Sequence, residues 1–177
     1  MSAALFLDRD GTIIKDVGDV KYITHVKFYD FTFEALQKAQ KFFKLFIITN
    51  QPGISKNILT HNDVVSVHDF IKNELSMNKI TIEEIYYCPH AKEDNCQCRK
   101  PNTFFIDEAV AKHKINVNNS FVIGDHPSDV MLAKRCGMQG IYVLTGHGRK
   151  HRNEVDNVIV KRNLYYAVDY ILKSVQV

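Results

Sequence analysis

Short apolar runs alternate with stretches of helical periodicity along this 177-residue chain. The apolar runs predict six strands, and continuous runs of this kind are typical of strands buried on both faces of a sheet. The strands are expected over residues 3–7, 44–48, 82–87, 120–123, 140–144 and 158–160. Apolar residues at helical spacing predict five helices, over residues 33–43, 62–77, 103–113, 129–136 and 164–175. This alternation predicts an α/β fold, a parallel sheet with helices on both faces.

Length and composition fit one domain spanning residues 1–177, with 45% hydrophobic and 24% charged residues. The formal charge of +3 is a weak basic bias that suits a small anionic substrate and is too small for a nucleic-acid-binding surface. No apolar run is long enough to span a bilayer, and the first residues lack the pattern of a secretory signal. We therefore expect a cytoplasmic monomer with no nucleic-acid or membrane partner.

Two aspartates directly follow the first apolar run, in the segment Asp8-Arg9-Asp10-Gly11-Thr12. Side chains two residues apart on an extended chain point to the same side, so Asp8 and Asp10 can share one reacting atom. Asp8 is the candidate nucleophile, which would form an aspartyl-phosphate, and Asp10 is the candidate general acid and base. The alternative is an acidic strand-to-turn junction in which Asp-Gly only reverses the chain.

A second acidic segment, Gly124-Asp125-His126, follows the fourth predicted strand, and Asp129 comes soon after it. Ligands of open α/β sheets bind outside the carboxyl ends of the strands, so these acids are expected to meet Asp8. Three carboxylates would repel one another unless a cation neutralised them. Mg²⁺ takes oxygen ligands and commonly bridges carboxylates to a phosphate. The alternative places Asp125 in a turn and Asp129 at a helix N-cap.

Candidate phosphate-binding groups follow two other strands. Thr49-Asn50-Gln51 ends the second predicted strand and offers a hydroxyl, amides and backbone N–H groups for phosphoryl oxygens. Arg99 and Lys100 supply a bidentate cation and a compact one. The alternative for Thr49-Asn50 is a simple helix-entry turn, and the alternative for Arg99 and Lys100 is a solvated surface pair.

Three of the four cysteines crowd into the loop 88–98 together with a histidine. In a reducing compartment such a cluster indicates a metal site more readily than a disulfide framework. Cys88, His90, Cys96 and Cys98 form a complete ligand set for one tetrahedral, structural zinc ion. Two cations follow Cys98 directly, so the zinc loop is expected to position them at the crevice.

Taken in order, these segments resemble the four motifs of the haloacid dehalogenase superfamily of phosphatases. The motifs are Asp8-Arg9-Asp10-Gly11-Thr12, Thr49-Asn50-Gln51, Arg99-Lys100-Pro101, and Gly124-Asp125 with Asp129. The zinc loop is similar to that of D-glycero-D-manno-heptose 1,7-bisphosphate phosphatases and the related histidinol-phosphate phosphatases. Thr145-Gly146-His147-Gly148 also resembles the segment that follows the last core strand of the heptose enzymes.

The resemblance implies a Rossmann-like, haloacid dehalogenase-like fold without a separate cap domain. It implies Asp8 as nucleophile, Asp10 as general acid and base, and a magnesium ion held by Asp8, the backbone carbonyl of Asp10, and Asp125. Thr49 and Lys100 would stabilise the transferring phosphoryl group, and Arg99 would recognise the substrate. The remaining candidates for substrate and phosphate binding are Asp16, Gly18, Asn50, Gln51 and His126.

The expected activity is hydrolysis of a phosphorylated sugar, D-glycero-D-manno-heptose 1,7-bisphosphate to its 1-monophosphate, in assembly of the lipopolysaccharide core. Two positions differ from the heptose enzymes: Asp19 stands where an aromatic residue is usual, and His126 where a lysine is usual. A neutral histidine binds a second phosphate less strongly than lysine, which bears on the preference for a bisphosphate. The alternatives are a histidinol-phosphate phosphatase and an inactive zinc-stabilised nucleic-acid-binding module.

Overall fold

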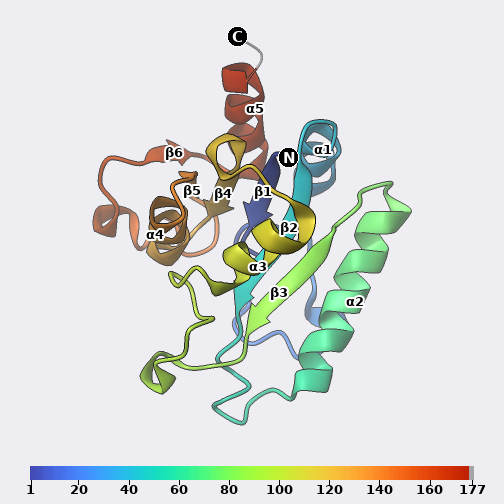
Figure 1. Ribbon diagram of the computed structural model, residues 1–177. Coiled ribbons are helices and arrows are strands. Elements are labelled where there is room, and N and C mark those ends of the chain that lie inside the picture. The colour runs from blue at the N-terminus through green and yellow to red at the C-terminus, as the bar shows by residue number, and fades with distance from the viewer. Residues whose placement is uncertain (176–177) are drawn as a thin grey trace.

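All six strands of the computed structural model, which describes residues 1–175, join one parallel sheet. They are β1 (Ala4–Leu7), β2 (Lys44–Asn50), β3 (Glu84–Cys88), β4 (Phe121–Gly124), β5 (Gln139–Val143) and β6 (Ile159–Lys161). Their order in the sheet is β3-β2-β1-β4-β5-β6 (Figure 1). The order reverses at β1, which pairs with β2 on one side and with β4 on the other. Such a switch point leaves a crevice at the carboxyl ends of the central strands.

Five α-helices cover the two faces of the sheet (Figure 1). They are α1 (Thr32–Ala39), α2 (His61–Met77), α3 (Phe104–His113), α4 (Pro127–Arg135) and α5 (Leu164–Val175). Short 3₁₀ turns lie at Ile23–His25, Lys92–Asp94, Val117–Asn119 and Arg152–Glu154. The buried faces of α1, α2 and α5 pack on one side of the sheet, and those of α3 and α4 on the other.

Alternate residues of each central strand enter different cores. In β1, Leu5 and Leu7 belong to the cluster that contains α1, α2 and α5, while Ala4 and Phe6 belong to the cluster with α3 and α4. All four side chains are almost completely buried. Burial on both faces explains why the strand is a continuous apolar run rather than an alternating one.

The predicted parallel sheet, its six strands and its five helices are confirmed. The first helix was expected to reach residue 43 but ends at Ala39, whose carbonyl accepts hydrogen bonds from the backbone N–H groups of both Phe42 and Phe43. The turn lets Phe43 pack edge-on against Phe121, with ring centroids 5.7 Å apart. None of the helices found over residues 1–175 combines the length and the apolar character that a bilayer-spanning segment needs.

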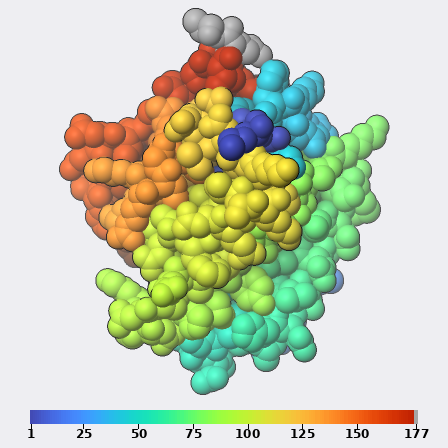
Figure 2. All heavy atoms as spheres, in the orientation of Figure 1, coloured from blue at the N-terminus to red at the C-terminus, as the bar shows by residue number. Residues whose placement is uncertain are grey.

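The loop that follows β3 projects beyond the sheet. It contains the 3₁₀ turn Lys92–Asp94 and forms the yellow-green lobe at the lower left of Figure 2. The chain returns from this lobe to the carboxyl ends of the strands at residues 99–101, which line the crevice.

Candidate active site

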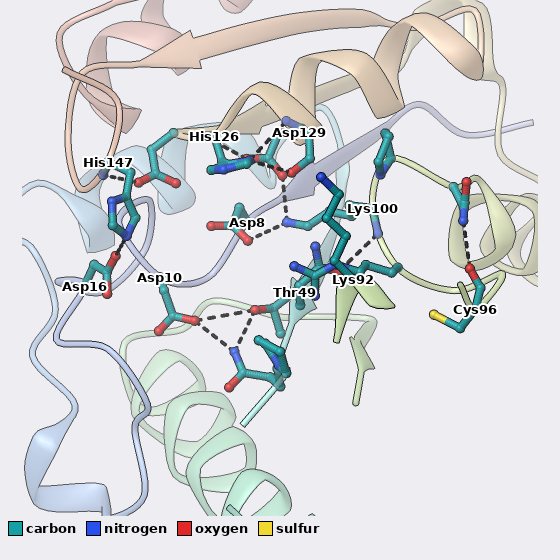
Figure 3. Close-up of a pocket in the computed structure, with 18 of the residues that line it drawn as sticks. Asp8, Asp10, Asp16, Thr49, Lys92, Cys96, Lys100, His126, Asp129 and His147 are labelled. Atoms are coloured by element: carbon teal, nitrogen blue, oxygen red, sulfur yellow. Dashed lines mark hydrogen bonds and ion pairs between the residues drawn. The ribbon is translucent and has the colours of Figure 1, made fainter. Parts of the chain in front are cut away.

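A cavity of about 640 Å³ lies at the carboxyl ends of the central strands. It brings together residues that are up to 139 positions apart in the chain, from Asp8 to His147 (Figure 3). Each predicted catalytic, substrate-binding or magnesium-binding residue lines it. They are Asp8, Asp10, Asp16, Gly18, Thr49, Asn50, Gln51, Arg99, Lys100, Asp125 and His126.

Three buried carboxylates meet at the base of the cavity. Oxygen atoms of Asp8, Asp125 and Asp129 lie within 4.8 Å of one another. The ammonium group of Lys100 lies between two of them, with Nζ 2.5 Å from Asp8 Oδ1 and 2.6 Å from Asp129 Oδ1 (Figure 3). The Ile48 carbonyl accepts a further hydrogen bond from Nζ at 2.8 Å, so the three donors of this ammonium have three acceptors.

One lysine does not balance three buried acids. Burial raises the pKa of Asp8 to about 7, and burial together with the charges of Asp8 and Asp129 raises the pKa of Asp125 to about 9. Burial alone would lower the pKa of Lys100, but the charges of Asp129 and Asp8 outweigh it and raise that pKa. A further cation would allow all three acids to ionise. The set of carboxylate oxygens suits Mg²⁺, a hard ion that prefers oxygen ligands.

Asp125 is enclosed by two loops that approach it closely because glycines stand at the contact. A Cβ atom on either Gly11 or Gly146 would lie 2.1 Å from Asp125 Oδ2, and both glycines have positive φ angles of 80° and 51°. The His147 backbone N–H donates to the same oxygen at 2.6 Å. The loops after β1 and β5 therefore fix this carboxylate from outside its own strand.

The alternative role predicted for Asp129, a helix N-cap, is wrong. The N-cap of α4 is His126, whose side chain accepts a hydrogen bond from the Ser128 N–H. Pro127 occupies the first helical position, which suits its fixed φ and its missing N–H. Asp129 is the third helical residue, and its Oδ2 accepts from the His126 N–H at 3.1 Å. This capping box leaves Oδ1 of Asp129 for Lys100.

Four donors surround the carboxylate of Asp10. Arg9 approaches it with Nε and Nη2, each at 3.0 Å from one of its oxygens. Gln51 Nε2 donates to Oδ2 at 3.0 Å, and Thr49 Oγ1 lies 3.5 Å from the same oxygen. The side chains of Gln51 and Thr49 thus contact Asp10 and each other, although both were predicted to face phosphate oxygens. Asp10 contributes no carboxylate to the acidic group of Asp8, so a metal contact from it would use its backbone carbonyl.

The two predicted cations reach the cavity in different ways. The Lys100 backbone N–H donates to Asn50 Oδ1 at 3.0 Å, which ties this residue to the end of β2. Arg99 Nη1 donates to the carbonyl of His90 at 3.0 Å. Arg99 is half-buried at the cavity wall, whereas Lys100 is 6% exposed at its base.

The thiols and imidazole of the loop 88–98 form one compact cluster. Sulfur atoms of Cys88, Cys96 and Cys98 lie 3.2–3.7 Å apart, and His90 Nδ1 lies 3.7 Å and 3.4 Å from the sulfurs of Cys88 and Cys98. Tetrahedral zinc with Zn–S near 2.3 Å and Zn–N near 2.0 Å places its ligands about 3.5–3.8 Å apart. The cluster therefore has both the donors and the spacing for zinc.

Several residues without a predicted role also line the cavity, among them Asp19, Lys92, Asn95, Asn102, Ser128 and His147. His147 Nε2 lies 2.6 Å from Asp16 Oδ2 (Figure 3). The other oxygen of this carboxylate, Asp16 Oδ1, accepts from the Gly18 N–H at 2.9 Å. The pair joins the predicted substrate loop to the loop after β5. The segment Thr145-Gly146-His147-Gly148, which resembles the heptose enzymes, is the sequence feature that points to a role for His147. Lys92 is recognisable only from its position two residues after His90, a predicted zinc ligand.

Known proteins with similar sequences identify the family to which this chain belongs. Residues 97–175 match the family described as HAD-hyrolase-like. The D-glycero-beta-D-manno-heptose-1,7-bisphosphate 7-phosphatase of Helicobacter pylori strain J99 is 34% identical over 170 residues, which cover 95% of this chain and 96% of that protein. This chain belongs to the heptose bisphosphate phosphatase family of HAD-like hydrolases.

Other members of this HAD-like group are similar too. The histidine biosynthesis bifunctional protein HisB of Buchnera aphidicola is 34% identical over 170 residues, but the match covers only 47% of that protein. The crystal structure of D,D-heptose 1.7-bisphosphate phosphatase from B. bronchiseptica, complexed with magnesium and phosphate, superimposes with a TM-score of 0.89. It is 23% identical, covers 98% of this chain and 99% of that one, and shows that the fold is shared.

The raised pKa values predict how Mg²⁺ affects stability. Asp8 and Asp125 have pKa values near 4 when unfolded and higher ones when folded. The metal-free folded protein therefore binds more protons than the unfolded chain, and its free energy of unfolding falls as pH rises from about 4 to 9. Because Mg²⁺ replaces these protons, we expect it to raise Tm more at about pH 8.5 than at about pH 5.5.

Differential scanning calorimetry with and without Mg²⁺ measures this difference. Asp125→Asn removes one of the titrating carboxyls and should diminish both the Mg²⁺ effect and its pH dependence. An equal rise in Tm at both pH values would contradict the cation requirement of the acidic group.

Freshly purified protein should contain about one zinc per chain, measured by plasma mass spectrometry. Cys96→Ser should lower the zinc content and reduce kcat/KM by roughly tenfold, because Arg99 and Lys100 follow the cluster directly. Cys136→Ser, at the far end of α4, is the matched control and should keep its zinc. If purified protein contained no zinc and still had full kcat/KM, the placement of Arg99 and Lys100 would not depend on the metal.

Proposed function

We propose that this protein is a magnesium-dependent phosphatase that hydrolyses a phosphate monoester through an aspartyl-phosphate on Asp8. One observation carries the proposal: Asp8 and Asp10 line the same cavity, with Lys100 paired to Asp8 and Asp125 beside it. The arrangement supplies a nucleophile, a group that moves protons, and cationic stabilisation within one water-accessible site.

In the first half-reaction a carboxylate oxygen of Asp8 attacks phosphorus. The bond from phosphorus to the leaving sugar oxygen breaks, and that oxygen takes a proton from Asp10. The Lys100 ammonium at the base of the cavity stabilises charge on the transferring phosphoryl group. The Thr49 hydroxyl at the end of β2 assists, since its contact with Asp10 is long at 3.5 Å and leaves it available to a phosphoryl oxygen.

In the second half-reaction water attacks the phosphorus of the aspartyl-phosphate. Asp10, now ionised, accepts a proton from that water. The bond between phosphorus and the Asp8 oxygen breaks, which releases inorganic phosphate and restores both carboxyl groups to their initial states. Asp8, Asp125 and the backbone carbonyl of Asp10 would hold Mg²⁺, which supplies positive charge to the phosphate oxygens when bound.

The substrate that we propose is D-glycero-D-manno-heptose 1,7-bisphosphate, converted to the 1-monophosphate in assembly of the lipopolysaccharide core. Its support is the family membership across 95% of the chain. Arg99 and the loop with Asp16 and Gly18 would bind the phosphate that is retained, with His126 at the cavity wall. Hydrolysis of histidinol phosphate is the second candidate, supported by the match to HisB.

The cellular compartment and the oligomeric state of the protein are further parts of the proposal. The cysteines of the described chain form no disulfide, which is typical of proteins in a reducing compartment, so we place the protein in the cytoplasm. We propose that residues 1–177 act as one monomeric phosphatase domain. A nucleic-acid-binding role draws no support from a cavity whose base is lined by three carboxylates.

A phosphate-release assay over a panel of substrates tests the assignment. Heptose 1,7-bisphosphate should give the highest kcat/KM and release one phosphate per molecule, ahead of histidinol phosphate and of simple hexose phosphates. Both anomers of the bisphosphate belong in the panel, because relatives named for each anomer are similar to this chain. A preference for histidinol phosphate would move the protein to the second candidate function.

Replacing Asp8 by asparagine should abolish turnover, because an amide does not attack phosphorus, whereas Lys100 keeps its ion pair with Asp129. The expected loss in kcat is at least about a thousandfold. Circular dichroism should show the native fold, since the two side chains have the same shape. Near-normal turnover by folded Asp8→Asn would rule out Asp8 as the nucleophile.

A further inference from the structure

A fully buried arginine stands between the two site aspartates in the sequence. The Arg9 side chain is 0% exposed and is not among the residues that line the cavity. One edge of its guanidinium group, Nε and Nη2, contacts both oxygens of Asp10. A bidentate contact of this kind fixes the plane of a carboxylate as well as its position. The orientation of Asp10 therefore depends on what holds Arg9.

The opposite edge of the same guanidinium group contacts a histidine from another element. Arg9 Nη1 lies 2.9 Å from Nε2 of His68, on α2, and His68 is 5% exposed. Arginine can only donate hydrogen bonds, so Nε2 of His68 is the acceptor and carries no proton. Burial, with the nearby charge of Arg9, lowers the pKa of His68 to about 3, so the ring is neutral at physiological pH.

His68 is the one polar residue among the buried residues of α2. The other buried residues of α2 are Val64, Val67, Ile71 and Leu75, all apolar. The His68 ring packs edge-on to the ring of Tyr87, on β3, at a centroid distance of 5.4 Å. Among the buried residues of α2, His68 is thus the one whose side chain offers a hydrogen-bond acceptor, and Arg9 uses it.

We propose that His68 is a positioning residue for phosphoryl transfer: it holds Arg9, and Arg9 aims the carboxylate of Asp10. The proposal rests on the proposed role of Asp10 as general acid and base. Without an acceptor at Nη1, a buried donor of Arg9 is left unpaired, and the guanidinium group rotates to satisfy it. Asp10 then loses its aim toward the leaving oxygen and the attacking water, although every group that touches substrate is still present.

The first test replaces His68 by leucine, which keeps the volume and removes the acceptor. With a hexose phosphate as substrate, kcat should fall by roughly ten- to a hundredfold, while KM changes by less than about threefold. His68→Gln presents an amide oxygen to Arg9 and should recover most of the loss. Should His68→Leu fail to fold, His68→Met serves as the apolar variant.

The second test separates proton transfer from general damage to the fold. Nitrophenolate leaves p-nitrophenyl phosphate without needing a proton, so in His68→Leu its release in the first turnover should stay within about threefold of the wild-type rate. Later turnovers, which need Asp10 to deprotonate water, should be slow. Val67→Ala, which loosens the packing of the same helix and keeps His68, is the matched control. It should preserve the wild-type ratio between the first-turnover rate of nitrophenolate release and the rate of later turnovers.

Asp10→Asn in the same assays distinguishes failure of this inference from failure of the proposed function. If Asp10→Asn hydrolyses hexose phosphate at the wild-type rate, Asp10 is not the acid and base and the proposed mechanism fails. If Asp10→Asn is slow but His68→Leu is not, the positioning role is overturned. Equal slowing of both phases by His68→Leu, without recovery in His68→Gln, would also overturn it. In the double variant, we expect His68→Leu to lower kcat little beyond the loss already caused by Asp10→Asn, because both changes act through the same group.

Discussion

Lys100 carries a positive charge into a buried group of three carboxylates, and the geometry of the site depends on this ion pairing. Its ammonium group joins Asp8 at the end of β1 to Asp129 in the first turn of α4. Removing one partner of a buried ion pair leaves an uncompensated charge, which is strongly destabilising. One lysine among Asp8, Asp125 and Asp129 still leaves an excess of negative charge. The fold thus holds a group of acids whose full ionisation needs a second cation, and Mg²⁺ has the chemistry to supply it.

The loop 88–98 explains how a lysine reaches this position. Lys100 lies on a connection between β3 and α3, where a flexible cation would otherwise stay in solvent. Two constraints hold it: the cluster that ends at Cys98, two residues earlier, and the hydrogen bond from its backbone N–H to Asn50. The two metals that we propose therefore have different tasks. Zinc would organise the loop that carries the lysine, and magnesium would neutralise the acids that the lysine faces.

Much of this architecture could be predicted because strand ends converge in a parallel sheet. Asp8 and Asp125 follow buried apolar runs, so periodicity and topology alone place them together. The four residues of the thiol and imidazole cluster are marked by residue type and spacing. Hydrogen bonds within the site could not be predicted. They depend on rotamers and on helices packed from distant parts of the chain, as when α2 brings His68 to Arg9. The helix-capping role of His126 escaped prediction because Asp129 is itself a common capping residue.

Covalent capture of the reaction intermediate tests the central claim most directly. Enzyme mixed with Mg²⁺ and substrate, quenched within one turnover and reduced with borohydride, converts an aspartyl-phosphate to homoserine. Peptide mass spectrometry then locates the modified residue. The mechanism proposed here predicts homoserine at position 8, only when substrate is present, and none at position 10. Rapid turnover with no homoserine at position 8, or with homoserine at another residue, would contradict it.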